Sequence, residues 1–170
     1  SFRNTRPFSY AGYTGMINPE NFEKLYLEFP DPSLFRHAVG GERYPQKPHT
    51  REMIFLDWPL FGVPFTRKGW YTDPSFLSPI WQELIRELRT SPLYRRFVCK
   101  AFDVSFFSIR FEWHLISAGT DICAHLDGGW RLGDHLFYFH RPGEWDANWG
   151  GSLEILGDKL TDSENPSFDE

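Results

Sequence analysis

The segment that decides the fold runs from His125-Leu126-Asp127 through Leu136-Phe137-Tyr138-Phe139-His140 to Trp149-Gly150-Gly151-Ser152-Leu153-Glu154. Residues 134–140 are rich in aromatic side chains and indicate a strand, residues 143–151 indicate a long turn, and residues 152–156 indicate a further strand. On a strand, side chains two positions apart point the same way, with Cα atoms roughly 6.5 to 7 Å apart. A strand through His125 and Asp127 would therefore direct an imidazole nitrogen and a carboxylate oxygen toward one metal ion.

A His-x-Asp pair alone is a short motif that also arises by chance, so the surrounding sequence decides its meaning. Here the pair is followed by a strand that contains Tyr138 and then by the pattern Trp-Gly-Gly-x-Leu-x-Ile, which begins at Trp149. Over roughly residues 106–157 this arrangement resembles the prolyl-4-hydroxylase-like branch of the 2-oxoglutarate- and Fe(II)-dependent dioxygenases. The resemblance implies a mainly β domain with flanking helices (α+β), built on a double-stranded β-helix of the jelly-roll or cupin-like kind.

The resemblance also implies an enzyme that uses Fe(II), 2-oxoglutarate as cosubstrate and O₂. Such an enzyme hydroxylates an unactivated C–H bond of a small-molecule or peptidyl substrate and releases succinate and CO₂. On this resemblance His125 and Asp127 are the catalytic metal ligands, and Tyr138 donates a hydrogen bond to the distal carboxylate of 2-oxoglutarate. Arg131 matches a basic position found in part of the family. Asp127 fills the place that halogenating relatives keep small, which favours hydroxylation.

The family's second metal-binding histidine, and the Arg or Lys that clamps the cosubstrate, have no counterpart at matching positions of this chain. We expect the distal histidine to lie beyond Glu170, together with the last strands that a jelly roll of about eight strands needs to close. As a single oxygenase domain, residues 1–170 would comprise helical and loop support (1–101), barrel strands with the metal motif (102–157) and a connecting segment (158–170).

Residues 102–117 predict a long strand with alternating character, either continuous or with one break, on which polar and apolar side chains occupy opposite faces. Its polar face contains Arg110, Glu112 and His114. If that face lines the barrel, Arg110 is a candidate to bind the cosubstrate and His114 to bind the substrate. Alternatively the face is solvated. Trp130, beside a Gly-Gly turn, either walls a substrate pocket or packs against the barrel rim.

Before this strand, local signals predict helices at 19–28 and 32–39, a strand at 51–58 and a loop at 61–71. Ser78-Pro79 predicts the start of the clearest helix, because apolar residues then recur at helical spacing. Ser91-Pro92 should interrupt this helix before a shorter continuation. The apolar stripe indicates packing against the sheet.

Composition narrows the class of protein further. The net charge of −5 and the absence of a basic stripe argue against a nucleic-acid partner, and no apolar run is long enough to span a membrane. Cys99 and Cys123 lack a metal-binding spacing and favour a reducing cytoplasm. The sequence is silent on the identity of the substrate and on the oligomeric state.

Two other classes of protein are compatible with this sequence. An aromatic-rich jelly roll can bind carbohydrate without iron, which predicts that Trp145 and Trp149 are exposed on one surface. A cupin-type metalloenzyme that does not use 2-oxoglutarate is the second alternative.

Overall fold

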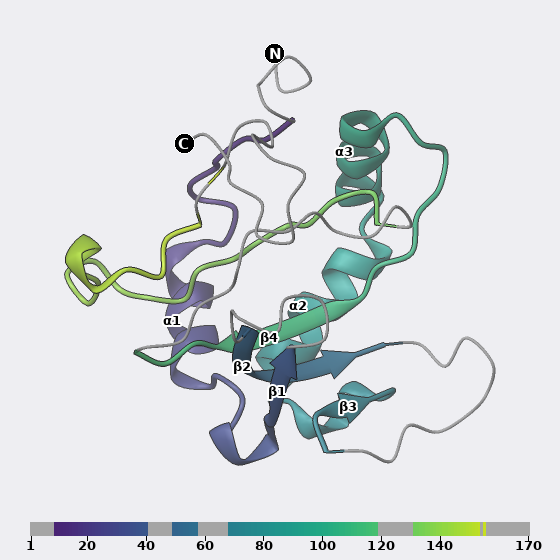
Figure 1. Cartoon of the computed structure of the whole chain (residues 1–170). Coiled ribbons are helices and arrows are strands. Elements are labelled where there is room, and N and C mark those ends of the chain that lie inside the picture. Colours follow the sequence, from purple (N-terminus) through teal and green to yellow (C-terminus); the bar gives the residue numbers. More distant parts are fainter. Residues whose placement is uncertain (1–8, 41–48, 58–67, 119–130, 154, 156–170) are drawn as a thin grey trace, which may run out of the picture.

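The computed structural model describes residues 9–40, 49–57, 68–118, 131–153 and 155. Within these ranges a four-stranded sheet lies beside helices α1 and α2, and helix α3 continues from the end of α2 (Figure 1). The helices are α1 Pro19–Leu27, α2 Pro79–Thr90 and α3 Pro92–Phe102, with single 3-10 turns η2 Pro32–Leu34, η3 Pro74–Phe76 and η4 Ala147–Trp149. The strands are β1 Arg36–Gly40, β2 His49–Leu56, β3 Trp70–Tyr71 and β4 Phe111–Leu115.

Strand β2 organises the sheet, because each of the other three strands pairs with it. β1 and β4 are antiparallel to β2, while the two-residue strand β3 is parallel to it. The register places Ile54 opposite Trp113 and Leu56 opposite Phe111. Since side chains alternate along a strand, this register directs the same apolar face of both strands toward the helices.

The core lies between that sheet face and the first two helices. Its buried residues are Leu25, Phe35, Ile54, Leu56, Leu77, Trp81, Ile85 and Trp113. The Trp81 indole stands edge-on to Trp113 at a centroid distance of 5.7 Å. Its Nε1 donates a hydrogen bond of 3.1 Å to the carbonyl of Leu25, which links α2 to α1. The apolar stripe predicted on α2 is thus confirmed as core packing.

Local capping signals explain where the helices begin. Asn18 accepts a hydrogen bond of 2.8 Å from the backbone N–H of Asn21, and Pro19 occupies the first helical position of α1. Ser91 ends α2 and caps α3. The predictions of a helix near 19–28, of a helix from 79 and of the interruption at Ser91-Pro92 are confirmed.

The predicted helix at 32–39 is wrong. Asp31 caps the turn by accepting a hydrogen bond from the Ser33 N–H, but η2 ends at Leu34. β1 then begins at Arg36, because pairing with β2 satisfies the backbone groups of this segment better than one isolated helix would.

The strands predicted nearer the C-terminus are shorter than expected or are missing. α3 continues to Phe102, so the strand predicted at 102–117 is reduced to β4. Residues 131–140 form no strand, although their alternation persists: Phe139 packs on the core while Tyr138 is exposed. Of the strand predicted at 152–156, the described residues 152, 153 and 155 show none. The double-stranded β-helix stays a prediction.

Candidate functional site

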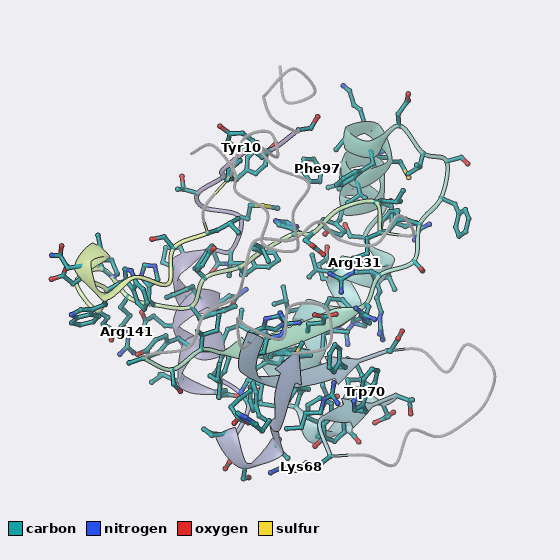
Figure 2. All side chains as sticks on the ribbon, viewed as in Figure 1. Tyr10, Lys68, Trp70, Phe97, Arg131 and Arg141 are labelled. Atoms are coloured by element: carbon teal, nitrogen blue, oxygen red, sulfur yellow. The ribbon has the colours of Figure 1, made fainter. Side chains whose placement is uncertain are left out.

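The sequence-predicted site residues fall into two groups. His125, Asp127 and Trp130 lie outside the described residues. Arg110, His114, Arg131 and Tyr138 are described, and the first three of these meet around a residue that the sequence did not single out, Glu112. Figure 2 shows the Arg131 side chain beside β4.

Glu112 is the centre of a charged cluster on β4. Its Oε1 accepts hydrogen bonds from Arg110 and, at 3.2 Å, from Nη2 of Arg131, while its Oε2 lies 3.1 Å from Nε2 of His114. The Glu112 side chain is only 18% exposed. Arg131 also approaches the Asp134 carboxylate, at 3.7 Å. One carboxylate therefore gathers three basic side chains, from β4, from the residue just before it and from the segment that follows residue 130.

Alternation along β4 produces this cluster. Trp113 is buried in the core, with Phe111 and Leu115 packed against it, so Arg110, Glu112 and His114 face the opposite side of the sheet. The predicted division of this strand into a polar and an apolar face is confirmed.

Apolar residues of β2 lie beside the charged cluster, on the same face of the sheet. Met53 pairs with His114 and Phe55 pairs with Glu112, and both β2 side chains are buried. The Arg110 guanidinium lies 5.4 Å from the centre of the Phe55 ring. Apolar groups next to a carboxylate reduce its contact with water and strengthen its interaction with nearby charges.

Glu112 is held in its ionised form. Burial raises the pKa of this carboxyl, but the hydrogen bond with His114 and the positive charges of Arg110 and Arg131 outweigh burial, and the pKa lies below its ordinary value. The cluster combines an anionic centre with two guanidinium groups, whose fork of N–H donors matches a carboxylate. An incoming carboxylate would have to compete with Glu112 for these donors.

Tyr138 is not part of the cluster. Its side chain is exposed, whereas Arg110, His114 and Arg131 are joined through the Glu112 carboxylate. Its assignment to the cosubstrate therefore depends on the sequence resemblance alone.

The sequence also failed to indicate a second charged cluster, which fastens the turn after residue 140 to α1. Arg141 donates to Oε2 of Glu23 from Nε at 3.1 Å and from Nη2 at 2.8 Å, and its guanidinium lies 4.1 Å from the centre of the Tyr26 ring. The Tyr26 hydroxyl donates to Glu144 at 3.1 Å. Figure 2 shows Arg141 beside α1. Partners 118 residues apart have no local sequence signal.

Trp145 and Trp149 occupy the same turn and are both exposed. Their ring centroids are 6.1 Å apart, with planes at 76°. The carbohydrate-binding alternative predicts exposure of both rings on one surface, and the structure agrees on that point.

In the described part of the chain, no three His, Cys, Asp or Glu side chains are grouped so that they could hold a metal ion. Over the same residues, none of the helices combines the length and the apolar character that crossing a bilayer requires. The sequence matches no protein-family model, and no curated protein or solved structure shows significant similarity to it.

Proposed function

We propose that the chain belongs to a 2-oxoglutarate- and Fe(II)-dependent oxygenase that hydroxylates an unactivated C–H bond of a small molecule or a peptidyl residue. The proposal rests on the His-x-Asp motif at 125–127 and the Tyr138 and Trp-Gly-Gly patterns that follow it. One structural observation supports it. Arg131, four residues after Asp127, forms an ion pair with Glu112 on the polar face of β4, beside Arg110 and His114.

In this proposal His125 and Asp127 supply two of the three iron ligands, and a further histidine supplies the third. When bound, iron and 2-oxoglutarate supply the oxidising chemistry, while the protein orients the reactants and excludes water. The chemistry of the described donor set fits an anionic cosubstrate, because Arg110 and Arg131 offer guanidinium N–H groups.

The remaining residues have narrower proposed roles. Glu112 holds Arg110 and Arg131 on one side of the sheet before a ligand arrives. His114 and Trp130 are assigned to the substrate and Tyr138 to the cosubstrate. A cytoplasmic location and a single domain over residues 1–170 belong to the same proposal. The runner-up is a cupin-type metalloenzyme that does not use 2-oxoglutarate.

The decisive experiment measures Fe(II) affinity and 2-oxoglutarate-dependent release of succinate by the full-length protein. Asp127→Ala should abolish iron binding or coupled turnover and leave the circular dichroism spectrum unchanged. Asp73→Ala is the matched control, since Asp73 caps η3 by accepting from the Ser75 N–H and has no part in the proposed site. Unchanged iron affinity in Asp127→Ala contradicts the proposal, as does a wild type whose succinate release does not depend on 2-oxoglutarate.

A second pair of variants tests the cosubstrate assignment. Arg131→Ala should weaken the binding of 2-oxoglutarate, whereas Arg86→Ala, which removes an exposed arginine paired with Glu83 on α2, should not. Equal affinity in both variants would remove Arg131 from the proposed site without affecting the iron assignment.

A further inference from the structure

A short turn holds aromatic rings together on the surface. Trp145 is 45% exposed and Trp149 is 68% exposed, and the two rings meet edge to face. The His140 ring lies 6.3 Å from the Trp145 ring, with planes at 31°. Figure 1 shows this turn, in yellow-green, projecting beyond α1. Burial of an indole would contribute roughly 25 cal/mol for each Å² of apolar surface, so two exposed indoles in contact need an explanation.

The backbone of the turn is fixed by its own hydrogen bonds. Asp146 Oδ1 accepts from the backbone N–H of Asn148 at 2.9 Å and from its side-chain amide at 2.8 Å. The Trp149 N–H donates to the Asp146 carbonyl at 2.9 Å. These bonds define η4 and therefore the direction in which Trp149 leaves the chain.

The Trp145 ring packs closely against Gly151. This glycine has a φ of 77°, and a Cβ atom at this position would lie 2.7 Å from Cη2 of Trp145. Only glycine allows this close approach of backbone to ring. Together with the ion pair between Arg141 and Glu23, which fastens the turn to α1, these contacts hold the rings in place before any ligand binds. Such preorganisation reduces the entropy lost on binding.

The charges of the turn limit what could bind there. Across residues 140–151 the acidic residues Glu144 and Asp146 outnumber the basic residue Arg141, which is itself paired with Glu23 and Glu144. This turn therefore offers no excess of positive charge for binding nucleic acids or acidic lipid surfaces. A cationic group binds best over the face of an aromatic ring, or in a cage of several rings. Here the two indoles contact each other edge to face and leave no cage between them.

A neutral sugar has matching chemistry. One face of a pyranose ring presents C–H groups, which pack on an indole, and its hydroxyl groups need hydrogen-bonding partners at the rim. The Asp146 carboxylate and the Asn148 amide are exposed next to the two indoles. We propose that Trp145, Trp149 and His140 form a binding site for a neutral saccharide, in which Trp149 stacks on a pyranose face and Asp146 and Asn148 bond its hydroxyls. This site is separate from the Glu112 cluster and does not depend on the oxygenase proposal.

The test titrates the full-length protein with cellohexaose, xylohexaose, mannohexaose and maltohexaose, each to about 10 mM, a range suited to weak binding. Tryptophan fluorescence and calorimetry report on binding. At least one sugar should bind saturably, and Trp149→Ala should weaken that binding about tenfold, as expected for loss of one aromatic contact. Trp149→Tyr should retain most of the affinity. Phe106→Ala is the matched control, because it removes a ring that is 74% exposed elsewhere on the surface.

Two ligands of other chemistry complete the test, namely heparin and an oligolysine peptide. The proposal is overturned if none of the four neutral sugars binds, if Trp149→Ala binds as the wild type does, or if either charged ligand binds this turn in preference to the sugars. Succinate release does not report on this site. The saccharide proposal is therefore tested by the sugar titrations alone, whatever the oxygenase assay shows.

Discussion

Arg131 and Glu112 are 19 residues apart in the chain, yet Nη2 of Arg131 lies 3.2 Å from Oε1 of Glu112. This ion pair joins the segment that follows residue 130 to the polar face of β4. Glu112 also contacts Arg110 and His114, so the carboxylate is the common partner of three basic groups.

Glu112→Gln should destabilise the protein. The substitution keeps the shape of the side chain but removes the charge that compensates two half-buried guanidinium groups. We expect the free energy of unfolding, measured in urea at pH 7, to fall by about 1 to 3 kcal/mol, the usual cost of leaving part of a buried polar network unsatisfied. Glu83→Gln, which breaks an exposed pair within α2, should change it by less than about 0.5 kcal/mol. Equal effects would show that the Glu112 cluster is only a solvated surface.

The wild type and Glu112→Gln should also differ in how their free energy of unfolding depends on pH. The pKa of Glu112 lies below its ordinary value of 4.5, so its ionised form stabilises the folded state. That contribution is complete above the unfolded pKa and is lost as the pH falls through the lower, folded pKa. Urea unfolding at successive pH values should therefore show the gap between wild type and Glu112→Gln closing below pH 4.5. A gap that persists undiminished into strong acid would argue against this charge interaction.

His135 should also make the folded protein less stable in acid, because its neutral form is the one that the fold favours. Its ring contacts Tyr94 and Phe137, and burial lowers the pKa of this imidazole. A histidine whose folded pKa is lowered stabilises the protein while neutral, and this stability is lost as the pH falls below 6.5 through the folded pKa. The stability of the wild type should thus decline more between pH 7 and 5 than that of His135→Gln. Parallel profiles would contradict the assignment.

Arg141→Ala should release the turn from α1. The arginine contacts Glu23 and Glu144 and stacks on Tyr26, and Lys could not reproduce the two-pronged contact with Glu23. Hydrogen exchange, followed by mass spectrometry, should become faster at backbone amides of residues 141–151 in Arg141→Ala and to a lesser degree in Arg141→Lys. Lys24→Ala, which removes an exposed pair on the same helix, serves as control. Unaltered exchange in all three variants would show that the turn is held by other contacts.

Trp81→Phe should weaken the junction of α1 and α2. Trp81 is buried, and its Nε1 is a hydrogen-bond partner of the Leu25 carbonyl. Loss of this bond inside the core should lower the free energy of unfolding by about 1 to 3 kcal/mol, whereas Leu93→Ala on the exposed surface of α3 should change it by less than about 0.5 kcal/mol. Thermal or urea unfolding measures both. A Trp81→Phe protein as stable as the wild type would show that another group bonds this carbonyl.

The helices were predictable because their signals are local. Pro19 and Pro79 each follow a residue suited to capping, and α1 and α2 begin there. Asp31-Pro32 contains the same signal, but its helix stops after one turn, because Arg36–Gly40 pairs with a strand that begins only at His49. Pairing between distant segments overrides a local propensity.

The candidate site, too, was predictable from local signals and not where it depends on contacts between distant segments. Alternation along β4 placed Arg110 and His114 on one face correctly, and Glu112 lies between them at the same spacing. An acid flanked by bases on a strand is equally typical of a solvated surface, so its central position could not be inferred. Its contact with Arg131 depends on how the chain returns to the sheet, which no short pattern specifies.

Ser91 joins α2 to α3 without any intervening residue, since it terminates the first helix and caps the second. The joint therefore sets the rotational phase of α3 about its own axis. Inserting one residue after Ser91 would change the direction and position of α3 relative to α2 and move Tyr94 away from His135, which it now meets at 3.1 Å. Length changes should thus be poorly tolerated at this buried serine, even though a connection between helices is ordinarily where chains vary.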